Sequence, residues 1–254
     1  GTTGRPKGVM LTHTNIVSNA LNTIPYLSLS EETVQLHVGP FFHVGAGQRI
    51  FTVTQAAGTH VILPAFRVSE ILHHIQAHRV NSMVLVPTMM RRILDHPERT
   101  LYDLSSLKYV SYGAAPMPDA LLQRFMLEFP RCQLSQSYGQ TECSPVATGL
   151  LHRDHLPSGP YGSKVGTVGR AVSTVEVRVG SVDEERAVGE VGEVLVRGPN
   201  VMRGYWNNPE ATAKTVIDGW LHTGDIGYLD EHDFLVIVDR IKDMIITGGE
   251  NVYS

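Results

Sequence analysis

Residues 108–137 read KYVSYGAAPMPDALLQRFMLEFPRCQLSQS, and this stretch decides the fold class. Two β-rich runs, 108–112 and 133–137, flank a segment at 118–129 in which apolar residues recur at the spacing of a helix. A strand, a helix and a second strand in succession form a βαβ crossover, which sets the two strands parallel with the helix over one face. The stretch therefore predicts a mostly parallel sheet covered by helices.

The same alternation extends toward the N-terminus, and a β-rich region follows it. Strands are expected at 34–38, 60–63 and 82–86, and helices at 14–22, 68–78 and 88–94. The Gly-, Pro- and Ser-rich stretch 153–166 indicates a linker. Beyond it, strands are expected at 175–179, 193–196 and 235–238, and a helix at 209–216. We predict an α/β protein with a parallel-sheet subdomain over 1–157 and a small, distorted β-barrel subdomain over 158–238.

The composition describes an ordinary globular chain with no global affinity for polyanions. Its 254 residues are 42% hydrophobic and 18% charged, and 21 basic against 25 acidic residues give a net charge of -4. This balance excludes a nucleic-acid-binding protein that depends on a basic surface. Two cysteines without CxxC spacing disfavour a disulfide framework and a thiolate zinc site. No transmembrane segment is expected, and we predict a cytoplasmic protein, with peripheral attachment to a membrane left open.

The first nine residues, GTTGRPKGV, have the composition of a phosphate-binding loop. Glycines allow backbone N–H groups to approach an anion, and hydroxyls with Arg5 and Lys7 add donors and positive charge. The order differs from a Walker A loop, because Lys7 precedes Gly8 and no Ser or Thr follows the lysine. Composition alone equally allows a flexible loop before the helix expected at 14–22.

Two further motifs follow expected strands directly. SYGQTE at 137–142 offers a ring that can stack on a base, a hydroxyl, and a carboxylate that can bind Mg²⁺. The side chains of YGAAP at 112–116 are mostly small, which would leave a slot for a flat ligand. Ligands in parallel α/β sheets lie beyond the carboxyl ends of the strands. Each motif by itself is also compatible with an ordinary strand-to-helix turn.

Other polar residues are ambiguous when taken singly. Asp225 in WLHTGD can accept the hydroxyls of a ribose, and Arg240 can donate to a ribose or a phosphate. The alternative is a turn carboxylate and a surface ion pair. His43 lies in a Gly- and Pro-flanked loop, where a structural role is equally open. The histidines at 73, 74 and 78 form no compact ligand face on a helix, and a solvated face is expected.

Taken in order, these segments resemble the adenylate-forming superfamily, which includes acyl-CoA synthetases, coumarate–CoA ligases, luciferases and nonribosomal peptide adenylation domains. The carriers of the resemblance are GTTGRPKGV, YGAAP, SYGQTE, GEVLVRGPNVMRGYW, WLHTGDIGYLD and DRIKDMIITGGENVYS, which span residues 1–254. Bacterial fatty-acyl-CoA synthetases are the most similar type. The resemblance implies that residues 239–254 are the hinge and the start of the C-terminal domain. It also implies that the N-terminal subdomain and most of the C-terminal domain, with its catalytic lysine, lie outside these residues.

The resemblance also implies roles for particular residues. His43 would lie beside the substrate carboxylate, and Lys242 would be the hinge between two domain orientations. By resemblance the residues that bind the nucleotide are Thr2, Thr3, Gly4, Lys7, Gly113, Ala114, Ala115, Tyr138, Gly139, Asp225 and Arg240. By the same resemblance the catalytic residues are His43, Thr141, Glu142 and Lys242, and Glu142 also binds the metal.

The implied reaction activates a carboxylic acid, with a fatty acid as the expected substrate, to acyl-AMP and then forms a thioester with coenzyme A. ATP, Mg²⁺ and coenzyme A are the implied cofactor and co-substrates, and the oligomeric state is left open. Amino-acid-activating relatives carry an acid near 42–44, and its absence here favours a plain carboxylate. Two alternatives remain: a non-catalytic ATP- or AMP-binding fragment, and an adenylation domain with a carrier protein as acceptor.

Overall fold

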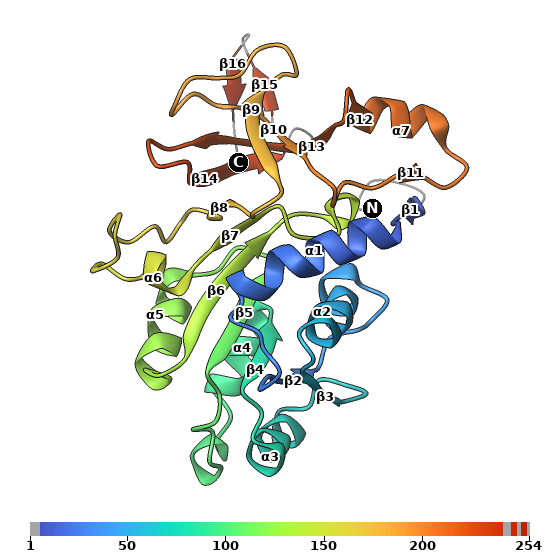
Figure 1. Ribbon diagram of the computed structural model, residues 1–254. Coiled ribbons are helices and arrows are strands. Elements are labelled where there is room, and N and C mark those ends of the chain that lie inside the picture. The colour runs from blue at the N-terminus through green and yellow to red at the C-terminus, as the bar shows by residue number, and fades with distance from the viewer. Residues whose placement is uncertain (1–5, 241–244, 248–249, 253–254) are drawn as a thin grey trace.

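Figure 1 shows the chain as a computed structural model, which describes residues 6–240, 245–247 and 250–252. Within this part of the chain, a seven-stranded sheet has the strand order β3-β2-β4-β5-β6-β7-β8. Neighbours from β3 to β6 are parallel, and β7 and β8 are antiparallel additions. The strands are β2 (Val34–His37), β3 (Thr59–Ile62), β4 (Ser82–Leu85), β5 (Tyr109–Gly113), β6 (Gln133–Tyr138), β7 (Thr148–Leu150) and β8 (Arg170–Ala171).

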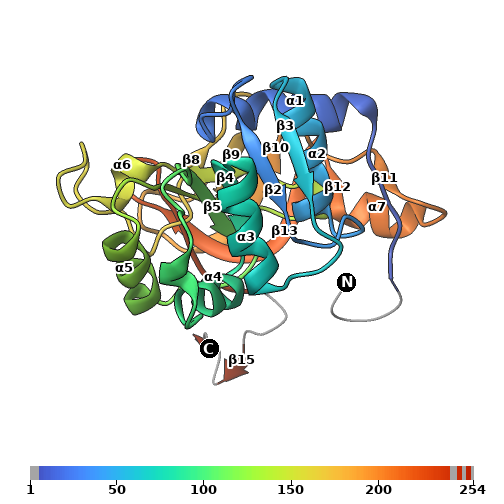
Figure 2. The same ribbon diagram turned by 90° about the horizontal axis from the view of Figure 1, so that it is seen from below.

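Helices cover both faces of this sheet. Figure 2 shows α1 and α2 on one face and α3, α4 and α5 on the other. The helices are α1 (His13–Tyr26), α2 (Val44–Gln55), α3 (Val68–His78), α4 (Pro87–Leu94), α5 (Asp119–Glu128) and the short α6 (His152–His155), with 3₁₀ turns η1 (Arg99–Leu101) and η2 (Thr141–Cys143). The expected βαβ unit at 108–137 is therefore confirmed as β5, α5 and β6. Helix α2 was not predicted.

The two faces of the parallel sheet differ in polarity. Alternate strand residues such as Met83, Val110 and Leu134 pack with α3, α4 and α5 in the main hydrophobic core. The intervening residues face the other way, as the period of two requires, and are mostly small or polar. Ser82, Ser111 and Ser135 are buried on that second face. The polar layer beneath α1 and α2 is consequently a buried feature, unlike the apolar faces usual for parallel sheets.

An antiparallel sheet curls beside the parallel one. Its strands are β9 (Glu176–Gly180), β10 (Gly192–Arg197), β12 (Val216–Ile217), β13 (Trp220–Leu229) and β14 (Leu235–Arg240). The long strand β13 pairs with β10 along one edge and with β12 and β14 along the other. Helix α7 (Pro209–Thr215) precedes this strand. The expected α/β class, with a mostly parallel sheet followed by a distorted β-barrel-like part, is confirmed.

Two short strand pairs complete the described chain. Strand β1 (Val9–Met10), just after the glycine-rich loop, pairs antiparallel with β11 (Gly204–Tyr205). Strands β15 (Ile245–Thr247) and β16 (Glu250–Val252) form the other pair. No helix among the described residues is both long and apolar enough to span a bilayer. Cys132 and Cys143 are buried free thiols, and burial raises the pKa of each to about 12.

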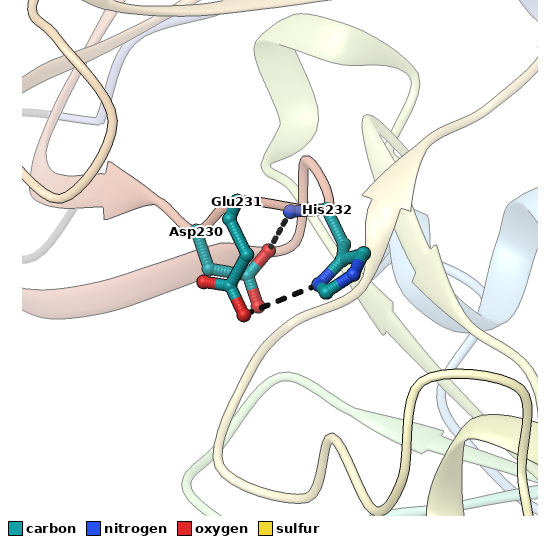
Figure 3. A group of neighbouring side chains, drawn as sticks. All are labelled: Asp230, Glu231 and His232. Carbon is teal, nitrogen blue, oxygen red and sulfur yellow. Dashed lines mark hydrogen bonds and ion pairs between the residues drawn. The ribbon is translucent and has the colours of Figure 1, made fainter.

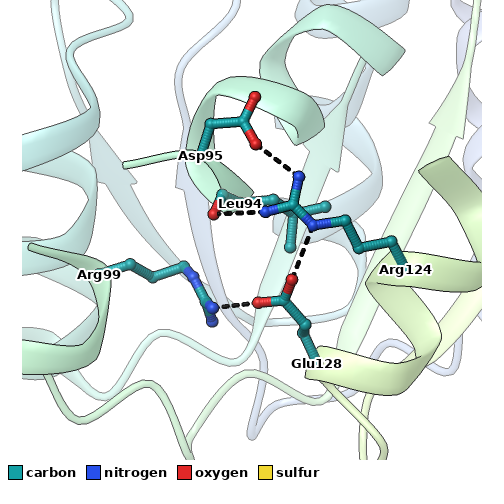
Figure 4. Close-up of polar contacts among 5 residues, drawn as sticks. All are labelled: Leu94, Asp95, Arg99, Arg124 and Glu128. Atoms are coloured by element: carbon teal, nitrogen blue, oxygen red, sulfur yellow. Dashed lines mark hydrogen bonds and ion pairs between the residues drawn. The ribbon is translucent and has the colours of Figure 1, made fainter. Parts of the chain in front are cut away.

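A polar network joins the outer ends of α4 and α5, as Figure 4 shows. Arg124 donates to Glu128 at 2.8 Å, to the Leu94 carbonyl at 3.0 Å, and to Asp95. Arg99 pairs with the same Glu128 carboxylate. The Leu94 carbonyl is one of those that a helix end leaves unpaired, so this arginine satisfies a group at the end of α4. The network joins two helices that pack on the apolar core. It lies far from the sheet edge that carries the candidate site.

Candidate active site

The candidate site lies at one edge of the parallel sheet. Strands β5 and β6 pair in register from Tyr109 with Gln133 to Gly113 with Ser137, so their carboxyl ends coincide. The YGAAP and SYGQTE motifs leave the sheet at those ends, and the loop with His43 follows β2 on the same edge. The prediction that these motifs gather beyond the strand ends is confirmed.

Two glycines allow the backbones in this region to approach closely. A Cβ atom at Gly113 would lie 2.4 Å from the carbonyl oxygen of Ser137 on the neighbouring strand. Gly139 has a φ of +150°, and a Cβ there would lie 2.0 Å from the Pro145 carbonyl. Ala114 has a φ of 63°, which turns the chain sharply after β5. No larger residue fits at the two glycine positions without a backbone shift, so the close approach of these backbone segments depends on the glycines.

A three-residue polar cluster joins the two sheets. The Tyr138 hydroxyl donates to Asp225 Oδ2 at 2.7 Å, and Arg240 Nε lies 3.0 Å from Asp225 Oδ1. Asp225 and Arg240 are directly opposed in the β13–β14 pair, which explains their contact. Burial, followed by the Asp225 carboxylate, raises the pKa of Tyr138 well above its ordinary value. The phenol is therefore a neutral donor at physiological pH.

The backbone around Asp225 is held from two sides. The Thr223 hydroxyl donates to the Val194 carbonyl at 2.7 Å and accepts from the Asp225 N–H at 3.0 Å. The Gln140 side chain reaches the Thr223 carbonyl at 3.4 Å, which ties the loop after β6 to β13. Asp225 is only 6% exposed. Each of its carboxylate oxygens keeps a further acceptor position, because a carboxylate offers about four lone-pair sites.

A second cluster surrounds Glu142. The Tyr205 hydroxyl donates to Glu142 Oε1 at 2.7 Å, and the Met202 N–H donates to the Glu142 carbonyl at 2.8 Å. Lys7 Nζ lies 4.3 Å from the centre of the Tyr205 ring. Burial, together with the Glu142 carboxylate, raises the pKa of Tyr205. Tyr205 therefore contacts both Lys7, at the end of the glycine-rich loop, and the Glu142 carboxylate.

The pairing of β1 with β11 produces this arrangement. Val9 opposes Tyr205, and the Trp206 N–H donates to the Gly8 carbonyl at 2.7 Å. The Arg203 N–H donates to the Met10 carbonyl at 3.0 Å. The end of the glycine-rich loop is thereby anchored to residues 203–206, the segment that also contacts Glu142 through Tyr205. The loop and this segment are more than a hundred residues apart in sequence.

His43 begins helix α2 as its N-cap. Its Nδ1 accepts the N–H of Gly45 at 3.2 Å, and the side chain is exposed. A neutral imidazole whose Nδ1 accepts carries its proton on Nε2, so the outer nitrogen is a donor. The neighbouring Phe42 is 94% exposed. His43 therefore presents a hydrogen-bond donor at the sheet edge beside an apolar ring.

The structure brings together some of the predicted site residues and leaves others undescribed. Tyr138, Asp225 and Arg240 form one cluster, and Lys7 and Glu142 meet across Tyr205. Thr141 begins η2 and is half-buried, and Ala114 and Ala115 are exposed. Thr2, Thr3, Gly4 and Lys242 lie outside the described residues. The roles of all these residues remain predictions.

Sequence reasoning did not find two residues that the structure makes prominent. Tyr205 was seen only as part of a motif, and its contact with Glu142 spans 63 positions. Arg49 on α2 is buried and donates to Ser111 Oγ at 2.7 Å. A charged residue among the small and hydroxyl residues of 44–55 was the signal that could have drawn attention to it.

A further acidic group lies in the turn between β13 and β14. Figure 3 shows Asp230, Glu231 and His232, whose ligand atoms lie within 4.8 Å of one another. Asp230 Oδ1 accepts the N–H groups of His232 and Phe234 at 2.8 and 2.9 Å, and Oδ2 accepts Lys164 Nζ at 2.7 Å. Both oxygens are thus engaged in fastening the turn, and we assign the group a structural role.

Comparisons with known proteins identify relatives of this chain. The sequence profile of the AMP-binding enzyme family matches residues 1–206. The chain is 40% identical over 258 residues to a feruloyl-CoA synthase from Amycolatopsis sp, covering 100% of this chain and 50% of that protein. It is 39% identical over 259 residues to a long-chain-fatty-acid–CoA ligase from Bacillus subtilis (strain 168), covering 100% and 45%.

A solved structure of a coenzyme A synthetase is also similar to this chain. The o-succinylbenzoate coenzyme A synthetase from Bacillus subtilis, in complex with ATP and magnesium ion, has a TM-score of 0.87 and 33% identity. That match covers 100% of this chain and 51% of the other chain. The chain thus spans about half the length of these relatives.

Proposed function

This chain belongs to the AMP-binding enzyme family, and we propose that the protein is an acid–thiol ligase that activates a carboxylic acid with ATP. A substrate carboxylate oxygen attacks the α-phosphorus, the bond to pyrophosphate breaks, and acyl-AMP forms. The thiol of coenzyme A, after losing its proton, then attacks the acyl carbon, and AMP leaves. The observation that carries the proposal is the Tyr138–Asp225–Arg240 cluster at the end of β6, because it supplies acceptors and donors for a nucleoside.

In this proposal Asp225 accepts both ribose hydroxyls through its remaining lone pairs, while Arg240 donates to the ribose or the phosphate. The hydrogen bond from Tyr138 fixes the carboxylate, so its orientation does not have to be arranged when the ligand binds. The Tyr138 ring stacks against adenine, and residues 113–115 and Gly139 line the slot. A base whose ring lies between such loops needs a close backbone approach, which the glycines permit.

Glu142, Thr141, Lys7 and the glycine-rich loop are proposed to hold the phosphates and Mg²⁺. Among the described residues only Tyr205 donates to the Glu142 carboxylate, so its other oxygen is available to a cation. Mg²⁺ is usually bound through one or two carboxylates together with phosphate oxygens, and this donor set fits that pattern. When bound, the ion would neutralise charge on the phosphates. Thr2 and Thr3 are proposed to add hydroxyl donors to the same phosphates.

His43 is proposed to meet the substrate carboxylate. Its Nε2–H can donate to the carboxylate oxygen as charge redistributes at the α-phosphorus. Lys242 is proposed as the pivot between the two half-reactions. The first step is a substitution at phosphorus, so positioning and electrostatic stabilisation account for most of the catalysis.

We propose a carboxylic acid of unspecified class as the substrate. The relatives named above are a feruloyl-CoA synthase and a long-chain-fatty-acid–CoA ligase, so similarity does not single out a fatty acid. A cytoplasmic location is part of the same proposal.

The proposal is tested by product analysis with ATP, Mg²⁺ and a panel of acids, with and without coenzyme A. We expect AMP and an acyl-CoA thioester in equal amounts. Glu142→Gln should abolish product formation, while Glu210→Gln, an exposed acid on α7, should not. Acyl-AMP without thioester would favour a carrier protein as acceptor. Nucleotide binding without any product would favour the binding-only alternative.

A further inference from the structure

Arg49 is a buried cation without a counter-charge. It lies on α2, is 9% exposed, and forms no ion pair among the described residues. Ser111 Oγ is its one hydrogen-bond acceptor there, at 2.7 Å from Nη2. An uncompensated buried charge is strongly unfavourable, and proteins rarely retain one unless something else supplies the partner.

The groups facing Arg49 do not supply a negative charge. Tyr26 lies close enough to interact with it, but burial raises the pKa of that phenol, so it stays neutral. His37 also feels the arginine, and burial, the neighbouring His60 and Arg49 together lower the His37 pKa to about 4. Burial lowers the pKa of Arg49 itself to about 10, which still leaves it protonated at neutral pH.

The guanidinium has donors to spare, and they are not sealed off. Nε and Nη1 donate to no acceptor among the described residues, yet neither is one of the fully enclosed polar atoms that lack a partner. Both nitrogens therefore keep some exposed surface and are not completely enclosed by protein atoms. On the face of the sheet beneath α1 and α2, the buried residues Ser82, Ser111 and Ser135 all have short side chains.

Arg49 also lies near two residues of the proposed reaction centre, Gly113 and His43. Ser111 precedes Gly113 by two residues on β5, so the two positions face the same way about 7 Å apart. His43, proposed to meet the reacting carboxylate, caps the same helix that carries Arg49. A substrate whose carboxylate lies near His43 and Gly113 would extend its far end toward the guanidinium.

We propose, on the basis of the proposed function, that Arg49 binds an anionic oxygen group, in particular a second carboxylate, at the distal end of the substrate acid. A guanidinium carries five N–H donors, and Ser111 accepts only one of them, so donors remain for the oxygens of a carboxylate. The substrate class is then a dicarboxylic acid of moderate length rather than a plain fatty acid. Arg49 acts as a specificity-determining residue and takes no part in bond formation.

The test compares straight-chain diacids of six to ten carbons with the monoacids of equal length. Binding of each acid is measured by calorimetry, and AMP formation is measured in parallel. We expect the best diacid to bind at least about ten-fold more tightly than its monoacid. R49M should remove this preference, and R49K should retain part of it. Gln48→Met is the matched control: Gln48 is equally buried on α2 and donates to the Ile16 carbonyl, so its loss should leave the preference intact.

Several outcomes would overturn the inference. An equal loss of affinity for both acids in R49M would mean that the arginine only packs against Ser111. An unchanged ratio, a preference for monoacids in the wild type, or binding of neither acid would also overturn it. The proposed function fails separately: a diacid preference that depends on Arg49 without any AMP formation would refute the ligase chemistry and leave the subsite standing.

Discussion

Replacing Asp225 by alanine is the substitution that separates ribose binding from phosphate binding. The carboxylate is buried, accepts a hydrogen bond from Tyr138, and faces Arg240 across the β13–β14 pair. If it holds the ribose, its removal should weaken ligands that contain a ribose and spare those that do not. AMP and pyrophosphate form such a pair of ligands.

The expected size follows from the hydrogen bonds that are lost. A hydrogen bond to a charged group contributes about 1.5–3 kcal/mol. Two ribose hydroxyls are involved, but water entering the vacated space replaces part of the interaction, so we count one bond as the lower limit. At about 1.4 kcal/mol per factor of ten, Asp225→Ala should weaken AMP binding roughly 10- to 150-fold. Pyrophosphate binding should change less than about three-fold, since that ligand has no ribose for the carboxylate to bind.

Calorimetric titration of both ligands into the wild type and the variant measures these ratios. Tyr138→Phe is the control, because it removes the bond to Asp225 but retains both the carboxylate and the stacking ring. It should weaken AMP less than Asp225→Ala does. Thermal unfolding monitored by circular dichroism shows whether each variant is folded. Equal losses for AMP and pyrophosphate in a folded Asp225→Ala protein would refute the ribose role.

Three other outcomes are expected. Tyr205→Phe removes the donor to Glu142, so Mg²⁺–ATP should bind about ten-fold more weakly in titrations while AMP binding stays constant; equal losses would contradict this. Gly113→Ala places a Cβ 2.4 Å from a carbonyl and should lower the free energy of unfolding by about 2–3 kcal/mol in urea denaturation. Gly162→Ala, at a φ of +70° in open space, should lower it by only about 1 kcal/mol, and a similar effect at both positions would argue against the close approach. Because burial lowers the pKa of His37 from 6.5 to about 4, unfolding takes up a proton between these values. Stability should therefore fall as pH drops through that window, by up to about 1.4 kcal/mol per pH unit, and less so in His37→Gln. An identical slope in the variant would exclude His37 as the cause.

The parallel sheet could be predicted because its strands and helices are short, regular and locally encoded. Helix α3 occurs at Val68–His78 as expected, β5 is shifted by one residue from the expected run, and β6 is one residue longer than expected. Helix α2 could not be predicted in the same way. Gly45 and Gly47 and several β-branched residues lower its intrinsic helix propensity, and its buried side is polar rather than apolar. Tertiary packing against α1 and the sheet stabilises it instead.

The site was predictable in its parts and not in its connections. Each motif indicates a chemistry, but the contact of Tyr138 with Asp225 depends on how β13 lies beside the end of β6, which no local pattern encodes. Strand β13 itself was hidden, because His222, Thr223 and Gly224 interrupt its apolar alternation and a register shift accommodates it beside β10. The burial of Arg49 could not be predicted for the same reason, because it depends on how α2 packs on the sheet.

The most direct test of the central claim is the exchange of labelled pyrophosphate into ATP, measured with Mg²⁺ and with or without a carboxylic acid. Formation of acyl-AMP is reversible, so the protein should exchange label only when an acid that it activates is present, and Glu142→Gln should abolish the exchange. Release of phosphate from ATP at the same rate with and without acid, or exchange that continues in Glu142→Gln, would contradict an adenylate-forming site at this sheet edge.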